Sequence, residues 1–183
     1  MQLLQAMLII RPRKPGGKSL IKFIAIAGIA AAGLLIPTIA GAQTPSSQFT
    51  VQITIAGACQ INSATNMDFG THGVLNTNTD ATSTVTVQCT NTTPFNIALN
   101  AGAGSGATVT DRLMTGTGGA TVGYSLYSNA ARDAVWGETA GTDTVAGTGT
   151  GAAQAFVVYG RVQPQNTPAP GAYTDTVTAT ITY

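Results

Sequence analysis

Few side chains in this sequence could carry out catalysis. It has a single histidine, His72, which lies beside glycines in the stretch 69–73. A serine–histidine–aspartate system would have to use His72 as its base, and the sequence contains no G-x-S-x-G motif to hold the serine. Paired carboxylates for glycoside hydrolysis would have to be drawn from Glu138 and six scattered aspartates. We therefore interpret His72 as a surface residue and expect no catalytic site.

Metal and cofactor sites also lack their usual ligands in the sequence. There is no cluster of histidine and cysteine that could bind zinc or another transition metal. Asp80, Asp111 and Asp143 do not form the alternating acidic loop that is typical of calcium sites. The glycine–threonine run 147–151 lacks the Gly-Lys-Ser/Thr ending of a phosphate-binding loop. The sequence predicts no metal-binding or cofactor-binding residue and no cofactor.

Trp136 and Arg132 are the remaining residues whose chemistry stands out. We expect the Trp136 ring to cap the core, with its N–H group hydrogen-bonded to the backbone. Arg132 is expected to pair with an acid or to stack on an aromatic ring. A sugar-binding platform built on Trp136 is the alternative interpretation.

Residues 1–42 are typical of a cleavable signal peptide. Five basic residues lead into the apolar run 23–36, which is followed by Pro37 and the small residues 40–42. A bilayer-spanning helix needs about 20 apolar residues, so this run is short for a membrane anchor, which is the alternative. We expect cleavage after Ala42, export from the cytoplasm and no membrane span in the mature chain.

Cleavage would change the charge of the protein. All 7 acidic residues follow Gln43, whereas only Arg112, Arg132 and Arg161 of the 8 basic residues do, which gives the mature chain a net charge of −4 and no lysine. Nucleic acids and anionic membranes bind basic surfaces, so neither is expected as a partner. Two cysteines in an oxidising compartment, Cys59 and Cys89, predict one disulfide.

Apolar and polar residues alternate with a period of two, which predicts an all-β protein. Strands are expected at 49–55, 85–89, 95–99, 122–126, 155–162 and 173–183. The run 155–162 is more continuously apolar, which predicts that both of its faces are covered. Turns are expected at 76–84, 100–110, 115–121, 137–151 and 164–171. This pattern indicates one immunoglobulin-like β-sandwich, with a closed barrel as the alternative.

The first and last strands of the mature sequence suggest strand exchange between molecules. The printed sequence ends on the regular run 173–183, so we expect no edge strand after Tyr183. A sandwich without its last strand would expose an apolar groove and unpaired backbone groups. The alternating run 49–55, ahead of Cys59, could fill such a groove on a neighbouring molecule. The alternative is that 49–55 pairs within its own sheet.

Several stretches of the sequence carry a resemblance to a known family. They are YSLYSNAARDAVWG at 124–137, VYGRV at 158–162, GAYTDTVTATITY at 171–183, GAC at 57–59 and VTVQC at 85–89. With these residues the sequence resembles the spore coat protein U domain over essentially the whole mature chain. That family includes the shaft subunits of archaic, Csu-type chaperone–usher pili.

The resemblance implies an incomplete immunoglobulin-like β-sandwich that is completed by a donor strand from a neighbouring subunit. Residues 43–56 would be the donor-strand segment and residues 57–183 the pilin domain, with Cys59 and Cys89 as the family's disulfide. The donor side chains would be Phe49, Val51, Ile53 and Ile55. The edge of the acceptor groove, which is also the chaperone-docking strand, would carry Val177, Ala179, Ile181 and Tyr183.

The function that the resemblance implies is structural and non-enzymatic. The protein would pass through the periplasm into a cell-surface fibre that supports adhesion or biofilm formation. Its partners would be identical or homologous pilin subunits, a periplasmic chaperone and an outer-membrane usher. The alternatives are a spore or cell-surface coat protein, a two-domain tip adhesin, a monomeric secreted carbohydrate-binding module and a hydrolase.

Overall fold

The computed structural model describes residues 41–183, which fall into two units. Residues 41–50 belong to the first unit and are exposed, with neither strand nor helix. Residues 51–183 form the second unit, which holds all the strands. Of the predicted signal peptide only Gly41 and Ala42 lie within the described residues, so the leader and its cleavage stay predictions. Among residues 41–183, no helix is long and apolar enough to cross a membrane.

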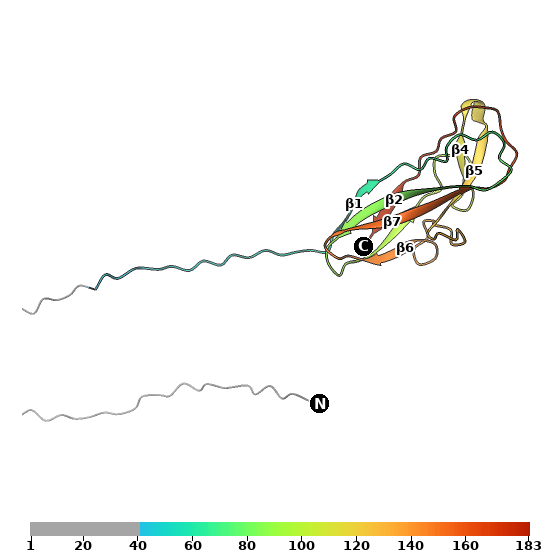
Figure 1. Ribbon diagram of the computed structural model, residues 1–183. Helices are drawn as coiled ribbons and strands as arrows, with labels where there is room; N and C mark the ends of the chain where they lie inside the picture. Colours follow the sequence, from blue (N-terminus) through green and yellow to red (C-terminus); the bar gives the residue numbers. More distant parts are fainter. Residues whose placement is uncertain (1–40) are drawn as a thin grey trace, which may run out of the picture. The chain divides into compact units, whose positions relative to one another are not determined.

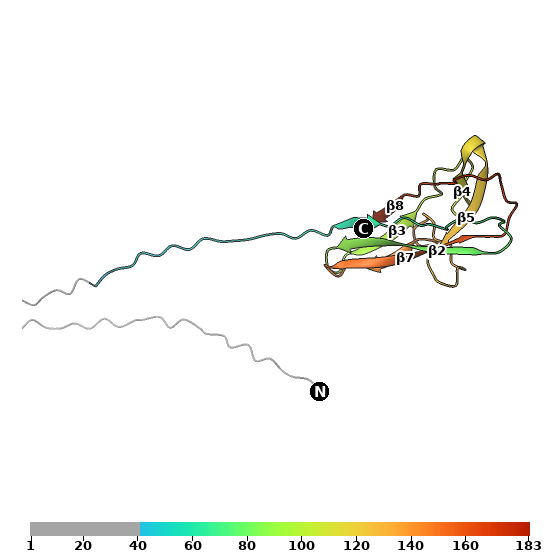
Figure 2. The same cartoon turned by 45° about the horizontal axis from the view of Figure 1, so that its top comes forward.

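The strands form two antiparallel sheets (Figure 1). The larger sheet has the order β1 (Cys59–Ala64), β2 (Thr79–Cys89), β7 (Ala153–Val162), β5 (Thr121–Tyr127) and β4 (Arg112–Thr115). The smaller sheet has the order β6 (Val145–Thr148), β3 (Pro94–Leu99) and β8 (Ala179–Thr182). Figure 2 shows β8 and β3 of the smaller sheet next to β1 and β2 of the larger one. The described residues are therefore all-β, apart from a short 3-10 turn at Thr117–Gly119.

Side chains that alternate along the strands build a single core between the sheets. Every second residue of β2 from Val85 to Cys89, and of β3 from Phe95 to Leu99, is at most 3% exposed. The longest ladder joins β2 to β7, from Thr79 opposite Val162 to Gln88 opposite Ala153. The period-two pattern in the sequence thus identified the strands that fill the middle of the sandwich.

Three segments form strands where the sequence predicted turns or no strand. β2 begins at Thr79, inside the expected turn 76–84, because its first half pairs with the long strand β7. β6 lies inside the expected turn 137–151, where it pairs with β3 and Gly147 leaves room for the ring of Phe95. β1, which the alternation did not predict, is held by its pairing with β2.

Two other expectations about strands were wrong in part. β7 has one covered face and one open face, because its residues alternate in burial and Val157 is 39% exposed. The run 173–183 forms a strand only at Ala179–Thr182, and before it Thr174 makes a single bridge to Thr115.

The core contains a buried cluster around Arg112 and Trp136, which we call the Arg–Trp cluster. The Trp136 ring is 1% exposed and its Nε1 donates to the carbonyl of Ile97 at 2.8 Å, as predicted. Arg112 is 0% exposed and donates four hydrogen bonds of 2.7–2.9 Å, all to main-chain carbonyls. These carbonyls belong to Leu99, Asn100, Val109 and Trp136. Burial lowers the pKa of the Arg112 guanidinium, and the four acceptors replace the water it loses.

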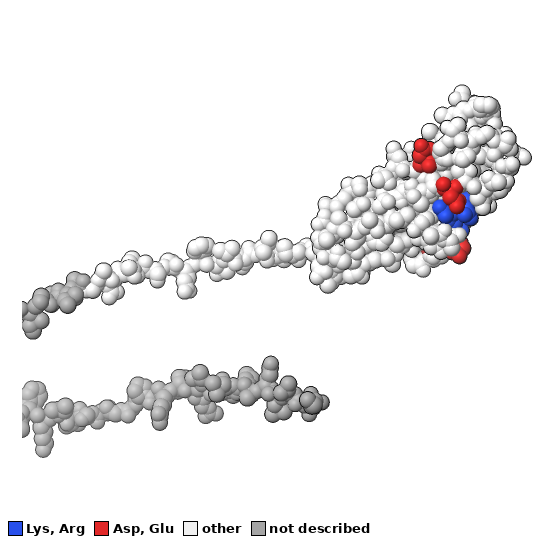
Figure 3. Space-filling view, viewed as in Figure 1, with Lys and Arg blue, Asp and Glu red and all other residues white. Residues whose placement is uncertain are grey.

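Three charged side chains on the surface, Asp80, Arg132 and Arg161, form one group. Figure 3 shows basic and acidic atoms together on one face of the domain, with two further acidic patches apart from them. Asp80 accepts hydrogen bonds of 2.7 and 2.9 Å from Arg161, which lower the pKa of Asp80. Arg132 pairs with Asp80 at 3.3 Å, and its guanidinium carbon lies 5.6 Å from the ring centre of Tyr159. Both expected partners of Arg132, an acid and an aromatic ring, are therefore present.

Candidate functional site: a groove between two free strand edges

Two of the strands at the ends of the sheets, β1 and β8, have their outer edges on the same side of the sandwich. β1 is the last strand of the larger sheet and pairs only with β2, whereas β8 is the last strand of the smaller sheet and pairs only with β3. The two strands approach each other across the sandwich. Within residues 41–183 no strand pairs with the outer edge of either. Such edges present a row of unpaired N–H and C=O groups, which can pair with another chain.

The backbone pairing of β8 shows which of its groups are free. Just before β8, Thr178 uses both its backbone groups on Asn100: its carbonyl accepts from Asn100 N at 3.1 Å, and its N–H donates to Asn100 Oδ1 at 2.9 Å. Backbone groups of a strand point to alternate sides, so the N–H and C=O of Val177, Ala179 and Ile181 face away from β3. The side chains of these three residues are half-buried against the core. Val177, Ala179 and Ile181 can therefore provide both backbone hydrogen bonds and apolar contacts to a strand that binds at this edge.

A groove of about 670 Å³ lies between the chain that follows β1 and the chain that leads into β8. Its floor is part of the hydrophobic core, because Val85, Leu99 and Val158 are each at most 4% exposed. Its walls combine polar residues, among them Thr65, Asn66 and Asp175, with apolar side chains that are only partly buried. The apolar ones include Met67, Phe69, Met114, Tyr173, Val177 and Ala179. The core of this sandwich thus opens to the surface along one side.

One end of the groove contains a polar pair with all its hydrogen bonds made inside the domain. The hydroxyl of Tyr124 donates to Asp175 Oδ2 at 2.7 Å, while Asp175 Oδ1 accepts from the backbone N of Ala103 and of Thr176, both at 2.7 Å. Burial, and then the hydrogen bond to Asp175, raise the pKa of Tyr124 above its usual value of 10.0. This end of the groove therefore has a carboxyl group whose position is fixed by hydrogen bonds.

The predicted acceptor residues lie along this edge. Val177 and Ala179 line the groove, and Ile181 packs against the core within β8. The side chain of Tyr183 is 64% exposed. Their roles in binding a donor strand or a chaperone stay predictions.

The predicted donor side chains are among the most exposed apolar groups of the described chain. Phe49, Val51, Ile53 and Ile55 are 87%, 83%, 84% and 68% exposed. Residues 41–58 form no strand, so the alternative that 49–55 pairs within its own sheet is not seen. Four large apolar side chains at alternate positions are thus left in solvent, which is unusual for a soluble segment.

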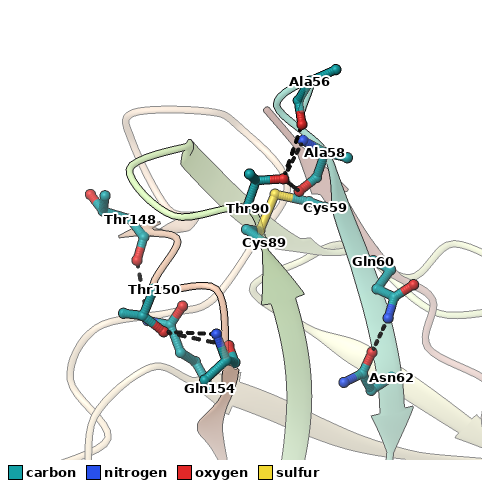
Figure 4. The surroundings of a disulfide bond; sticks show 11 residues. Ala56, Ala58, Cys59, Gln60, Asn62, Cys89, Thr90, Thr148, Thr150 and Gln154 are labelled. Carbon is teal, nitrogen blue, oxygen red and sulfur yellow. Dashed lines mark hydrogen bonds between the residues drawn. A yellow bond between two sulfur atoms is a disulfide. The ribbon is translucent and has the colours of Figure 1, made fainter. Parts of the chain in front are cut away.

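The predicted disulfide between Cys59 and Cys89 is present and joins β1 to β2 (Figure 4). It links the first residue of β1 to the last residue of β2, opposite each other in the ladder. β1 is thereby tied to the sheet although its other edge has no strand beside it.

The candidate residues for other chemistry are not brought together. His72 is exposed, as expected, and its Nε2 lies 2.6 Å from the carbonyl of Phe69. The interpretation of Trp136 as a sugar-binding platform is wrong, because its ring is buried in the Arg–Trp cluster. Within the part of the chain that the structure describes, no group of three histidine, cysteine, aspartate or glutamate side chains could hold a metal ion.

Comparison with protein families gives a match over most of the chain. Residues 46–180 match the family described as the Spore Coat Protein U domain. The chain belongs to this family. "Protein U" of Myxococcus xanthus is 35% identical over 178 residues, which cover 89% of this chain and 98% of the relative. The match begins at residue 46 and so takes in the exposed segment 49–55 as well as the sandwich.

A solved structure has the same fold as this spore coat protein U domain. It is a crystal structure of the CsuC–CsuE chaperone–tip adhesion subunit pre-assembly complex, from the archaic chaperone–usher Csu pili of Acinetobacter baumannii. The TM-score is 0.52 at 23% identity, over 71% of this chain and 40% of the matched chain. This chain therefore spans about two fifths of the matched one. The likeness confirms the immunoglobulin-like fold that the sequence predicted.

Proposed function

We propose that this protein is a structural subunit of a surface fibre, in which the exposed segment of one copy fills the groove of the next. One observation carries the proposal: the same chain has an open apolar groove between two free strand edges and an unpaired segment with alternating apolar side chains. Each feature alone is costly in water, and each supplies what the other lacks. An extended segment that adds to a sheet edge gains main-chain hydrogen bonds and places alternate side chains in pockets.

The dimensions of the two parts agree. Alternate residues of a strand are about 6.7 Å apart, so Phe49 to Ile55 would span about 20 Å. The edge from Val177 to Tyr183 has the same number of residues and would have a similar length when extended. The free backbone groups of Val177, Ala179 and Ile181 would bind the donor backbone, while Phe49, Val51, Ile53 and Ile55 enter the groove.

The burial of four apolar side chains would make the joint strong. Each contributes about 1.5–3 kcal/mol when fully buried, so the four together supply about 6–12 kcal/mol. The ordering of residues 43–56 offsets part of this gain. Pairing along the backbone of the donor adds hydrogen bonds that must all break before the subunits separate. We therefore expect the joint to dissociate very slowly.

The open groove supports the proposal that a periplasmic chaperone binds the subunit before assembly. An uncovered groove and a free edge favour non-specific aggregation, so a subunit that waits for its neighbour needs a temporary occupant. The pre-assembly complex of the Csu relative contains a chaperone and a subunit, which supports such a partner here. An outer-membrane usher and export by the leader 1–42, with cleavage after Ala42, complete the proposed route to the cell surface. There the fibre would support adhesion or biofilm formation.

A second candidate function is a structural protein of a spore or cell-surface coat. The description of the matched family and the identity to "Protein U" favour this alternative. The joint between subunits would be the same, and the final location would differ. Immunogold labelling of whole cells distinguishes thin fibres from a continuous coat.

The deciding experiment deletes residues 43–56 in cells that also produce the chaperone and the usher. The truncated subunit should be exported and form its disulfide, but it should not polymerise. Normal fibres from this variant would refute the proposed function.

A matched pair of substitutions tests the direction of the side chains in the donor segment. Ile53→Asp places a charge on the face that would enter the groove, whereas Thr54→Asp places the same charge on the opposite face. Fibre yield should fall strongly for Ile53→Asp and little for Thr54→Asp, with equal export of both. Equal yields would contradict the role of Ile53.

A further inference from the structure

We propose that Thr90 is a positioning residue that keeps the donor segment out of the groove of its own domain. The inference rests on the proposed function and concerns how a subunit is made to pair with a neighbour. It arises from the root of the donor segment, which we define as residues 56–58, between Ile55 and the start of β1. The root is attached to the turn that follows β2, and Thr90 makes the attachment (Figure 4).

The side chain and backbone of Thr90 hold both ends of the root. Ala58 N donates to Thr90 Oγ1 at 3.0 Å, and Thr90 N donates to the carbonyl of Ala58 at 2.9 Å. Thr90 Oγ1 also lies 3.2 Å from the carbonyls of Ala56 and Ala58. A hydroxyl has one proton, and the Ala58 carbonyl already receives the N–H of Thr90. The Thr90 hydroxyl therefore donates its proton to the carbonyl of Ala56 and accepts a hydrogen bond from the N–H of Ala58. In this way Thr90 bridges Ala56 and Ala58.

Thr90 is itself firmly placed. It follows Cys89, which is 1% exposed and bonded to Cys59. The turn after it is braced by the neighbouring loop, since Thr92 N donates to Gly149 O at 2.8 Å and Gly149 N donates to Thr93 O at 2.7 Å. The bridge from Thr90 to the root thus starts from a rigid part of the domain.

This bridge matters because the groove of the same domain is within reach of the donor segment. Only the root separates Ile55 from Cys59, and β1, which begins at Cys59, ends at Ala64 in the lining of the groove. Three-residue loops are common in β-hairpins, and a glycine in the loop gives the backbone more freedom to reverse its direction. Gly57 occupies the middle of the root. The sequence therefore allows the donor segment to turn back and pair with β1.

In the structure the root does not make this turn. Gly57 is not in the left-handed conformation, whereas seven other glycines of the described chain are. A reversal would have to reorient the N–H of Ala58 and the carbonyl of Ala56, which are the groups that Thr90 holds. A subunit that filled its own groove could neither donate nor accept a strand. The Thr90 hydroxyl thus favours exchange between copies over closure of a single copy.

The test compares Thr90→Val, which keeps the shape and loses the hydroxyl, with Thr90→Ser, which keeps the hydroxyl. The full chain is produced in cells together with its chaperone and usher. Among disulfide-bonded subunits only, the ratio of chaperone-free monomer to polymer is measured, so that misfolded material does not enter the ratio. Deuterium uptake by the amides of residues 49–55 in the monomer reports whether the segment is paired.

Thr90→Val should raise the ratio of monomer to polymer about fivefold, as expected for the loss of roughly one hydrogen bond, and should protect the amides of 49–55 in the monomer. Thr90→Ser should behave as the unchanged chain. The same ratio for Thr90→Val and the unchanged chain would overturn the inference, as would a raised ratio with unprotected amides.

A second variant leaves Thr90 untouched. Two glycines inserted between Ile55 and Ala56 lengthen the possible loop, so this chain should also close on itself more often. An unchanged ratio would overturn the inference, because reversal at the root would then not limit closure. Ile53→Asp separates this outcome from failure of the proposed function. If donor-strand exchange is right and only the role of Thr90 is wrong, Ile53→Asp still lowers polymer while Thr90→Val changes nothing.

Discussion

The Arg–Trp cluster and the groove between β1 and β8 are two parts of the same core with opposite properties. In the cluster, the guanidinium and the indole N–H find carbonyl partners, and both side chains are at most 1% exposed. Along the groove, large apolar side chains are half-buried and the edges of both strands are unpaired. The sandwich is thus complete at the cluster, where the polar groups are paired and buried, and incomplete at the groove, where strand edges are unpaired and apolar side chains are exposed in part. We call these the finished and the unfinished region. We expect the finished region to set stability and the unfinished region to set assembly.

The largest effect is expected in the cluster. Trp136→Ala should lower the free energy of unfolding by about 3–5 kcal/mol, because it empties a buried site and removes the indole hydrogen bond to the Ile97 carbonyl. Urea denaturation is followed by circular dichroism, since the variant removes the protein's only tryptophan. Trp136→Phe, whose ring fills part of the same site, should lower the free energy of unfolding by a smaller amount. A loss below about 1 kcal/mol for Trp136→Ala would show that the cluster does not dominate stability.

The disulfide is the main covalent support on the open side. Replacing Cys59 and Cys89 together by serine should lower the free energy of unfolding by about 3–4 kcal/mol, because the bond closes a 30-residue loop in the unfolded chain. The same denaturation experiment measures it. If this double variant lost more free energy of unfolding than Trp136→Ala, stability would depend mainly on the side with the groove. That result would contradict the expectation that the Arg–Trp cluster sets stability.

Tyr124 links the two regions, since it lies opposite Arg112 in the ladder of β4 and β5 and its hydroxyl binds Asp175 in the groove. Its pKa is raised in the folded state, so above pH 10 the unfolded chain loses this proton while the folded chain keeps it. The free energy of unfolding should therefore be intact below pH 10 and fall above it, by at most about 1.4 kcal/mol per pH unit. Urea midpoints measured from pH 8.5 to 11 should show a shallower fall for Tyr124→Phe. Equal slopes for the two proteins would contradict the role of this hydroxyl.

The smallest effect on folding is expected on the groove wall. Val177→Thr keeps the shape of the side chain and makes it polar, so the free energy of unfolding should change by less than about 1 kcal/mol. Binding of a synthetic peptide with the sequence of residues 43–56 should weaken about five- to tenfold, because one contact of the donor becomes polar. Thr178→Val, on the opposite face of the same edge, is the control and should leave the affinity unchanged. If Val177→Thr lowered the free energy of unfolding by more than the free energy of peptide binding, the groove wall would contribute more to folding than to binding. The proposed difference between the two regions would then be wrong.

The middle of the fold could be predicted from the sequence because its strands alternate between core and surface. Val85 to Cys89 and Phe95 to Leu99 carry large apolar residues at every second position, which is a strong signal. The first half of β2 and the whole of β6 consist mainly of threonine, glycine, alanine and valine, and they are strands because long neighbours pair with them. Pairing of this kind depends on tertiary context, which local sequence does not contain.

The candidate site was predictable only at its two strand segments. The predicted donor run 49–55 and the edge run 177–183 show period two, whereas Met67 and Phe69, after β1, and Met114, in β4, line the groove without giving a local signal. Arg112 had no predicted role, because three of its four acceptors, Leu99, Asn100 and Trp136, lie in two segments of the chain that meet Arg112 only in the fold. The attachment of the root to Thr90 was missed for the same reason.

The distribution of arginine has a consequence for resistance to proteases. Trypsin-like proteases cut only after lysine or arginine, and after Gln43 the chain has no lysine and three arginines. Arg112 is fully buried, and the other two are held in ion pairs with Asp80. The exposed segment 43–58, which is otherwise the natural target for proteolysis, contains no basic residue. We expect the folded protein to resist digestion by this class of protease although residues 43–56 are exposed.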